Sequence, residues 1–431
     1  MIKARLSRLY AQTTPRGRGM IVLLAFVLLL ALASGDSVLY RLSYFLALVL
    51  VVGYAWTRVN LSRLRMWVEE QATVAQVGDT LEGSIYVCNE SPLPSGWIEI
   101  VQVSDMPGDV RGGAAELPPR GWEAWKAERF CCARGVYTIG PLVARGSDPL
   151  GLFHAQKTEG DVIKAVVYPP IVELPYFGLP VAGLSGNERV VHRPETRSSH
   201  AGTVREYSPG DSLNRIHWPS TARRGQLMSK EFDSGGYGEV WIVLDLEQEV
   251  QESAGMEKTD EYAVAAAASL ANLALAEERS TGLIAYGDQD YILPLGSGTQ
   301  QMSRVSETLA RSRTEGDVSL SDVLSLNATR FGRFASVLVV TSSTDTEWVS
   351  LLLNLAFRGL NIVVVLVDPA SFGGDRSRSQ VVTELVSAGI PAYVIRKGDL
   401  LPLALSHPVR AHELPLSEQP GVRELMSTAG T

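Results

Sequence analysis

The 431-residue sequence has few of the side chains and motifs that mark cofactor and disulfide chemistry. Its three cysteines, Cys88, Cys131 and Cys132, are too few for a disulfide framework and lack the two-residue spacing of a zinc or redox pair. No glycine-rich phosphate loop connects a strand to a helix, so the Rossmann and P-loop fingerprints are both missing. The nucleophile elbow of the α/β-hydrolases is missing too. We therefore expect the cysteines to be small buried hydrophobic residues.

Cationic side chains are scarce outside the N-terminus. Residues 1–65 hold nine Lys or Arg and one acid, which leaves 30 basic and 46 acidic side chains in residues 66–431. Because each phosphate contact favours a cation, such an acidic body argues against general nucleic-acid binding. Apolar residues, in contrast, make up 45% of the chain, which excludes a disordered protein. The length suggests two or three domains.

Two long apolar segments lie near the N-terminus, at residues 19–35 and 38–56. Each reaches the roughly 17 to 25 residues with which a helix crosses a bilayer. Only Gly35-Asp36-Ser37 connects them, a length suited to a tight turn. We therefore predict a transmembrane helical hairpin within residues 1–65.

Basic side chains flank both ends of this predicted hairpin, which places both ends in the cytoplasm. The expected protein is thus a multi-pass protein of the cell membrane whose soluble domains are cytoplasmic. The alternative is a cleaved signal peptide, because residues 31–34 resemble a small-residue cleavage site. The body of the protein would then be extracellular, which the arginines after residue 56 oppose.

Residues 66–185 show the short alternating pattern of β-strands. Apolar and polar residues alternate in segments that Gly, Pro and Asp separate, as in strands with one buried face. About six such strands over a hundred residues are typical of a β-sandwich, which we predict here. The predicted strands are 73–77, 81–87, 97–103, 122–131, 135–139 and 162–168.

Residues 239–400 change to longer apolar runs that alternate with helical segments. Runs without polar alternation are typical of a parallel sheet that is covered on both faces. We predict a doubly wound α/β domain, in which sites form at the carboxyl ends of the strands. The predicted strands are 240–246, 283–286, 336–341, 362–367 and 392–395, and the predicted helices are 260–279, 300–313, 345–358 and 379–388. Residues 401–431 are expected to form a tail, to which no role is assigned.

The densest polar segment, residues 186–238, connects these two predicted domains. Its candidate binding residues are Arg205, Tyr207, Gly210, Asp211, Arg215, His217, Trp218 and Arg223. Pro-Gly-Asp is turn chemistry, and Arg side chains suit carboxylates, phosphates or backbone carbonyls. Two interpretations stay open. The segment is either an internal clamp, with Asp211 and Glu231 as ion partners, or a docking surface for an acidic partner or an anion.

This segment resembles the signature of domain-of-unknown-function family 58. Arg134-Gly-Val-Tyr-Thr-Ile-Gly-Pro141, Asp148-Pro-Leu-Gly-Leu-Phe153 and the paired N-terminal helices extend the resemblance over nearly the whole chain. The resemblance implies a β-sandwich followed by a von Willebrand factor type A-like domain. It also implies two partners, a MoxR-type AAA+ ATPase and a transglutaminase-like membrane protein. No biochemical activity is established for the family.

The resemblance further implies a position where type A domains often bind a divalent cation. Their motif is Asp-x-Ser-x-Ser, whereas this chain has Asp245-Leu-Glu247-Gln-Glu249. The aspartate is retained and both hydroxyl positions hold carboxylates, which repel one another without a cation. Thr341-Ser-Ser-Thr-Asp345 also departs from the usual Thr-Asp-Gly. We therefore expect no cofactor and no stabilisation by Mg²⁺.

The function expected from these observations is that of a membrane-anchored cytoplasmic adaptor without enzymatic activity. Its partners would be the AAA+ ATPase and membrane lipid, and its role would lie in envelope assembly or protein maturation. The alternative is a metal-dependent enzyme in which Asp245, Glu247 and Glu249 bind the ion and His217 carries protons. A third interpretation, an adhesion module that faces outward, is opposed by the flanking charges.

Overall fold

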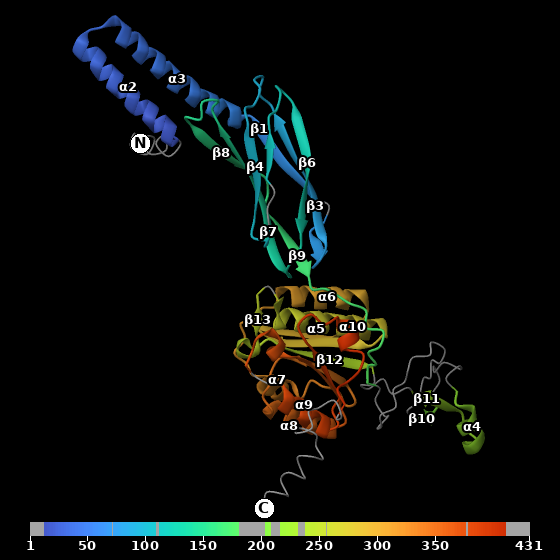
Figure 1. The fold of residues 1–431 in the computed structure, drawn as a ribbon. Helices are drawn as coiled ribbons and strands as arrows, with labels where there is room; N and C mark the ends of the chain where they lie inside the picture. Colours follow the sequence, from blue (N-terminus) through green and yellow to red (C-terminus); the bar gives the residue numbers. More distant parts are fainter. Residues whose placement is uncertain are drawn as a thin grey trace, which may run out of the picture. The chain divides into compact units, whose positions relative to one another are not determined.

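The computed structural model describes residues 13–70, 72–108, 112–180, 203–207, 216–231, 238–255, 257–375 and 378–410. The chain divides into two compact units, Met1–Tyr168 and Pro169–Thr431. Figure 1 labels the helices and strands of both. Together they form a mixed α/β protein with two N-terminal apolar helices and several sheets. The sequence predicted this general composition of helices and strands.

Two antiparallel helices begin the first unit, α2 (Pro15–Ser34) and α3 (Ser37–Ser62), and both are long and apolar enough to cross a membrane. The turn between them consists of two caps. Gly35 ends α2 in the left-handed conformation and donates its amide to the Ala31 carbonyl, while the Asp36 side chain accepts the Val38 amide at the start of α3. The helices extend beyond the expected spans, because α2 begins at Pro15 and α3 continues to Ser62.

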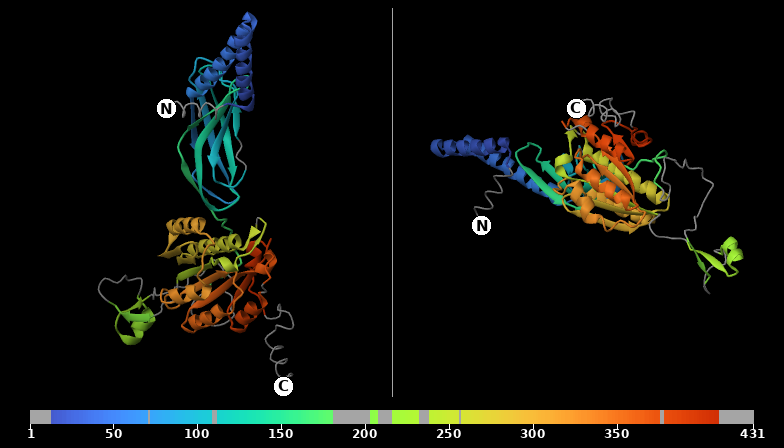
Figure 2. Two further views of the ribbon diagram at one scale, coloured as in Figure 1. Left: turned by 90° about the vertical axis from the view of Figure 1, so that its left-hand side faces the viewer. Right: turned by 90° about the horizontal axis from the view of Figure 1, so that it is seen from below.

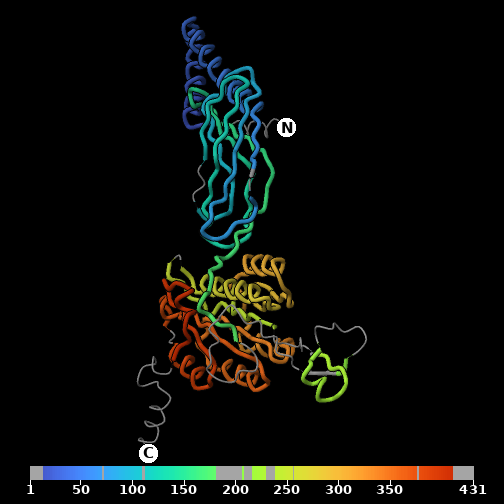
Figure 3. Tube along the Cα trace, turned by 90° about the vertical axis from the view of Figure 1, so that its right-hand side faces the viewer, coloured from blue at the N-terminus to red at the C-terminus, as the bar shows by residue number. Residues whose placement is uncertain are grey.

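The remainder of the first unit consists of two sheets. The three-stranded sheet has the order β1-β3-β6, and the other has the order β2-β9-β7-β4-β5 with β8 paired to β7. Figures 2 and 3 show their long strands from further sides. The bounds are β1 (Leu64–Glu70), β2 (Val74–Gln76), β3 (Thr80–Asn89), β4 (Ile98–Ser104), β5 (Gly113–Ala115), β6 (Trp122–Phe130), β7 (Gly135–Ser147), β8 (His154–Glu159) and β9 (Ile163–Tyr168).

Two apolar clusters contain buried residues of both sheets, and the larger one includes the ends of the strands near α3. Met66 and Ile85 come from the three-stranded sheet and pack with Ile98, Ile100 and Leu142 of the other. Alternate residues of each strand point into these clusters, as the period of two in the sequence predicts. The cysteines do not all follow the prediction. Cys131 is buried, Cys88 is partly buried and Cys132 is exposed.

The second unit contains a six-stranded sheet with the order β16-β15-β12-β17-β18-β19. Five strands are parallel, but β16 pairs antiparallel with β15, so the predicted all-parallel sheet is wrong at this edge. The connection between β15 and β16 spans only residues 287–289, too few for a crossover to a parallel strand. The bounds are β12 (Glu239–Asp245), β15 (Ser280–Tyr286), β16 (Asp290–Gly296), β17 (Ser336–Thr341), β18 (Asn361–Val367) and β19 (Ala392–Ile395).

Helices cover both faces of this sheet (Figure 1). On β12, Ile242 packs in a cluster with the alanines of α5, whereas its neighbour Val243 packs in a second cluster with Leu324 and Trp348. Two apolar faces explain why the strand sequences lack polar alternation. The helices are α5 (Thr259–Ala276), α6 (Gly298–Arg311), α7 (Leu320–Asn327), α8 (Glu347–Phe357), α9 (Ser379–Ser387) and α10 (Leu401–Ala404).

The borders of the second unit differ from those expected at residues 185 and 400. Leu174 and Phe177 are buried in its core, and the Val172 amide donates to the Ser269 hydroxyl, so residues 169–180 belong to it. At the other end, Leu405 is fully buried in the same core. The first residues of the expected tail are therefore part of the domain, because their apolar side chains complete its packing.

Candidate functional site

The carboxyl edge of the six-stranded sheet holds a buried polar pair. Asp245 ends β12 and Thr341 ends the neighbouring β17, and the two side chains are 3% and 0% exposed. The Thr341 hydroxyl donates to Asp245 Oδ2 over 2.6 Å, and the Glu247 amide donates to Oδ1 over 3.1 Å. Adjacent parallel strands place these residues side by side, as expected for a site in a doubly wound sheet.

Burial changes the chemistry of this carboxyl group. Removal of Asp245 from water raises its pKa from the ordinary 3.8 to about 6, although the hydrogen bonds from Thr341 and the Glu247 amide lower it. The carboxyl therefore titrates close to neutral pH. A group of this kind at a strand end is a candidate functional residue.

Residues from the loop after β12, the start of α5 and the loop before α7 complete the hydrogen-bond network around this pair. Gln251 donates through Nε2 to the Asp245 carbonyl and accepts through Oε1 from Thr259 over 2.7 Å. The Gln248 amide donates to the Gly316 carbonyl, which ties the loop after β12 to the loop before α7. Sequence analysis did not identify Gln251 or Thr259. Their only signal is their position shortly after the strand, because neither belongs to a motif.

The acids considered as metal ligands do not come together in this network. Glu247 is partly buried, while Glu249 is exposed in the short 3₁₀ helix η2 (Gln248–Val250). Across the described residues, no three His, Cys, Asp or Glu side chains form a group that could hold a metal ion. Both Asp245 oxygens already accept hydrogen bonds from the protein. This donor set does not fit the octahedral oxygen shell of Mg²⁺.

The segment with the sequence signature forms a small element of its own in the described residues. Strand β10 (Thr203–Glu206) pairs antiparallel with β11 (Met228–Glu231), and the seven-residue helix α4 (Trp218–Arg224) lies between them in sequence. The Tyr207 amide extends the ladder by donating to the Leu227 carbonyl. Ile216 and Met228 are buried, which gives the element a small apolar centre.

His217 has a local structural role at the start of α4. Its side chain accepts the Ser220 amide at Nδ1 over 3.3 Å, and the same nitrogen lies 2.7 Å from the Ser220 hydroxyl. Trp218 follows with 65% of its side chain exposed. Arg223 and Arg224 are exposed in the last turn, before Gly225 ends the helix. The helix buries none of its residues, so its tryptophan and its two arginines are all accessible.

Several predicted site residues lie outside the part of the chain that is described. These are Gly210, Asp211 and Arg215. Arg205 is placed by its backbone alone, opposite Ser229 in the β10–β11 ladder. The predicted ion pairs with Asp211 and Glu231 therefore stay predictions, and the choice between clamp and docking surface stays open.

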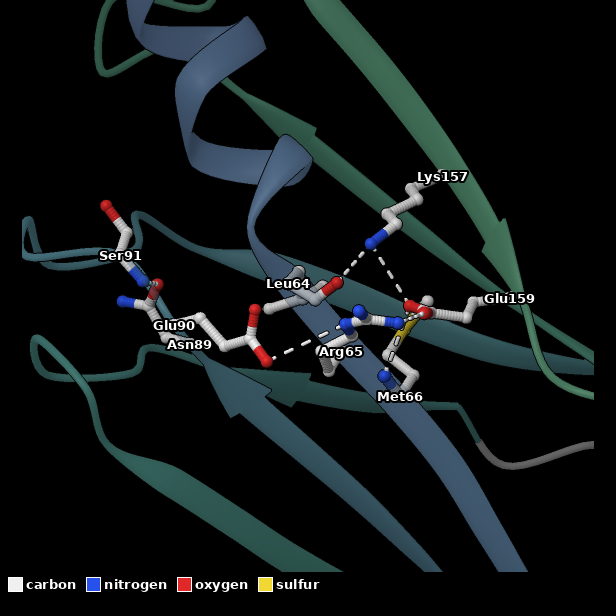
Figure 4. Close-up of polar contacts among 8 residues, drawn as sticks. All are labelled: Leu64, Arg65, Met66, Asn89, Glu90, Ser91, Lys157 and Glu159. Atoms are coloured by element: carbon white, nitrogen blue, oxygen red, sulfur yellow. Dashed lines mark hydrogen bonds and ion pairs between the residues drawn. The ribbon is translucent and has the colours of Figure 1, made fainter.

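The junction of α3 and β1 is a further polar site, which sequence analysis missed (Figure 4). Only Arg63 separates the helix from the strand. Lys157 donates to the Leu64 carbonyl and pairs with Glu159, which also accepts the Met66 amide over 3.3 Å. The alternation of apolar and polar residues at Leu64, Met66 and Val68 was the available signal for β1. Because the strand begins directly after the apolar helix, this signal is hard to separate from the helical pattern.

Comparisons with known proteins relate the chain to one family. Residues 203–372 match the model of the family described as protein of unknown function DUF58. The uncharacterized protein YeaD of Bacillus subtilis (strain 168) is 29% identical over 128 residues, which are 30% of this chain and 29% of that protein. The match therefore spans less than a third of that relative's length.

Similar solved structures are remote in sequence. A CARDB domain from Pyrococcus furiosus is 11% identical and covers 24% of this chain and 91% of its own, with a TM-score of 0.20. Proximal thread matrix protein 1 from the mussel byssus is 11% identical over 40% of this chain and 46% of its own, with a TM-score of 0.30. Scores this low support no argument about fold or function.

Proposed function

Residues 203–372 belong to the DUF58 family of proteins of unknown function, and from this premise we propose that the chain is a membrane-anchored interaction protein. Helices α2 and α3 span the cell membrane, and both soluble parts face the cytoplasm. The basic residues on both flanks of the hairpin support this orientation. The two packed sheets of the first unit then form a β-sandwich next to the membrane.

The observation that carries the interaction role is the exposed surface of α4. Trp218 is 65% exposed at the start of α4, and Arg223 and Arg224 are exposed in its last turn, on a helix within the family match. Tryptophan and arginine are the residues that most often dominate protein–protein interfaces. An acidic partner suits this surface best. The partner suggested by the family resemblance is a MoxR-type AAA+ ATPase, with a transglutaminase-like membrane protein as a further member of the assembly.

The six-stranded sheet serves in this proposal as a von Willebrand factor type A-like binding scaffold. Its carboxyl-edge network is satisfied by internal hydrogen bonds around Asp245 and Thr341, which favours a structural role over catalysis. The side chains at this edge, Asp245, Glu247 and Glu249, do not form a metal site within the described part of the chain, so they give no support to the alternative of a metal-dependent enzyme.

The experiment is affinity purification of the full-length protein from its native membranes in detergent, with ATP or a slowly hydrolysed analogue. We expect nucleotide-dependent recovery of an AAA+ ATPase. The double substitution of Trp218→Ala and Arg223→Ala should reduce recovery about tenfold or more, the effect of losing one or two interface hot spots. Arg304→Ala, at an exposed arginine on α6, is the matched control. Equal recovery from both variants, or no partner in either nucleotide state, would refute the proposal.

A further inference from the structure

A groove with a volume of about 240 Å³ lies along the C-terminal part of α3. Val52, Ala55 and Val59 of the helix form one wall, and Leu93 and Pro94 of the loop between β3 and β4 form the other. All of these belong to the first unit. The walls are apolar, so the groove suits a hydrocarbon chain.

Two polar side chains also line the groove, and one of them has an unpaired donor. The indole nitrogen of Trp56 is buried and has no acceptor among the described residues. Asn60, which is only 7% exposed, also lines the groove. A Cβ atom on Gly96 would lie 3.7 Å from Asn60 Nδ2 and 3.8 Å from Trp56 Nε1, so both nitrogens face the same place.

Unpaired buried donors are rare in proteins, because their desolvation is not compensated. The unpaired indole donor of Trp56, with the Asn60 amide close to it in an apolar groove, therefore points to a ligand with oxygen acceptors beside an apolar chain. Glycine at position 96 leaves the space next to both donors open. A ligand that fits both the apolar walls and the polar donors is amphipathic.

The surroundings identify the class of ligand. Val52 and Val59 of the groove are 54% and 43% exposed, so the groove continues into the apolar surface of α3. The exposed Arg63 follows Trp56 by seven residues, about two helical turns, and thus lies on the same face of the helix. Along this face come apolar side chains, then two donors, then a cation. A phospholipid has the matching order of acyl chain, ester carbonyls and phosphate.

We propose that this groove is a binding site for one membrane phospholipid. The acyl chain lies against Val52, Ala55 and Leu93, Trp56 and Asn60 donate to an ester carbonyl oxygen, and Arg63 pairs with the phosphate. This proposal rests on the proposed membrane anchoring. It adds a specific lipid contact at the point where the hairpin joins the sheets, and that contact would hold the first unit against the membrane surface.

The test uses the full-length protein in lipid nanodiscs that contain phosphatidylglycerol with a photoreactive diazirine on one acyl chain. After illumination, mass spectrometry of the digested protein locates the cross-links. We expect them to concentrate on residues 52–59 and 91–94. Ala55→Trp fills the groove and should reduce these cross-links about tenfold, whereas Val22→Trp, on the exposed surface of α2, should leave them unchanged.

Asn60→Leu is the second variant, since it keeps the volume of the side chain and removes its polar groups. It should weaken lipid retention about tenfold, the effect of losing a hydrogen bond to a buried acceptor. Cross-links spread evenly over both helices, and equal in all variants, would overturn the groove assignment while leaving the anchoring intact. Release of the wild-type protein from native membranes by alkaline carbonate would instead overturn the anchoring, and the groove proposal with it.

Discussion

Thr341 donates a 2.6 Å hydrogen bond to the buried carboxyl group of Asp245 and so joins the ends of two adjacent parallel strands. The Thr341 oxygen also accepts the Ser343 amide over 2.8 Å. One hydroxyl group therefore connects β12, β17 and the loop that follows β17. The loops that follow the parallel strands leave the sheet at this edge. The Asp245–Thr341 pair therefore helps to fix the position of the loops that follow β12 and β17.

Thr341→Val should lower the free energy of unfolding by about 1–3 kcal/mol at pH 7, because the buried Asp245 carboxyl loses a donor. Valine has nearly the shape of threonine, so the change removes little packing. Chemical denaturation of the full-length protein in detergent, followed by fluorescence, measures the difference. Thr341→Ser is the control, since it keeps the hydroxyl and loses one methyl group. Equal stability of the valine and serine variants would contradict the role of this hydrogen bond.

Asp245 should make the stability of the protein depend on pH. Burial raises the folded-state pKa to about 6, from an ordinary value of 3.8. Between these values the folded state binds more protons than the unfolded state, so stability falls as pH rises from about 4 to about 6. A shift of roughly two pKa units corresponds to about 3 kcal/mol.

Asp245→Asn removes this titration. Relative to wild type, we expect the variant to gain up to about 3 kcal/mol in unfolding free energy as the pH is raised from 4 to 7. Denaturation curves at four pH values measure the gain. Asp290→Asn, at an exposed aspartate, controls for the general loss of one negative charge. Parallel pH profiles for wild type and Asp245→Asn would show that the carboxyl does not titrate in this range.

Much of the fold follows from the sequence because the strand patterns reflect burial directly. The run at residues 336–341 is apolar without alternation, and the structure shows β17 with these bounds and every residue buried. The edge strand β16 escaped prediction because its burial pattern is irregular, with Pro294 in its interior. Helix α7 was missed as well. It has only eight residues, too few for a clear helical period.

The candidate site was less predictable than the fold. Asp245 was named through the resemblance to the metal motif of type A domains, as a doubtful ligand, and the structure places it at the end of β12. Its partners Gln251 and Thr259 depend on how the loop after β12 turns back, which no local pattern specifies. Asn60 looked like an ordinary polar residue after an apolar run. Its burial becomes visible only when the loop near Gly96 closes over it.

The polar contacts between β8 and the start of β1 should stabilise the first unit. Glu159 accepts the Met66 amide and pairs with Lys157 over 3.1 Å, and both charged side chains are partly buried, at 22% and 27% exposure. Glu159→Ala leaves the amide without this acceptor and removes the ion pair of Lys157, and we expect a loss of about 1–2 kcal/mol. The thermal unfolding of the full-length protein measures it.

Glu99→Ala is the matched control for this junction. Glu99 also pairs with a basic residue, Arg145, but over 3.8 Å and with both side chains more than half exposed. An exposed pair of this kind contributes at most about 1 kcal/mol and often much less. If Glu159→Ala were no more harmful than Glu99→Ala, the contacts that join β8 to β1 in Figure 4 would contribute little to stability.

His217 should act through the start of α4 rather than as a proton carrier. Its side chain accepts the Ser220 amide, the role that Asn, Asp, Ser and Thr usually fill at a helix N-terminus. His217→Ala should therefore cost about 1 kcal/mol locally and make the amides of residues 220–224 exchange about fivefold faster, whereas His217→Asn should retain most of the protection. Hydrogen exchange with mass spectrometry of the full-length protein reads this segment directly. Trp218→Ala removes an exposed side chain and serves as the control, with exchange unchanged. Equal exchange in the alanine and asparagine variants would mean that His217 does not cap the helix, and its place in the signature would then need another reason.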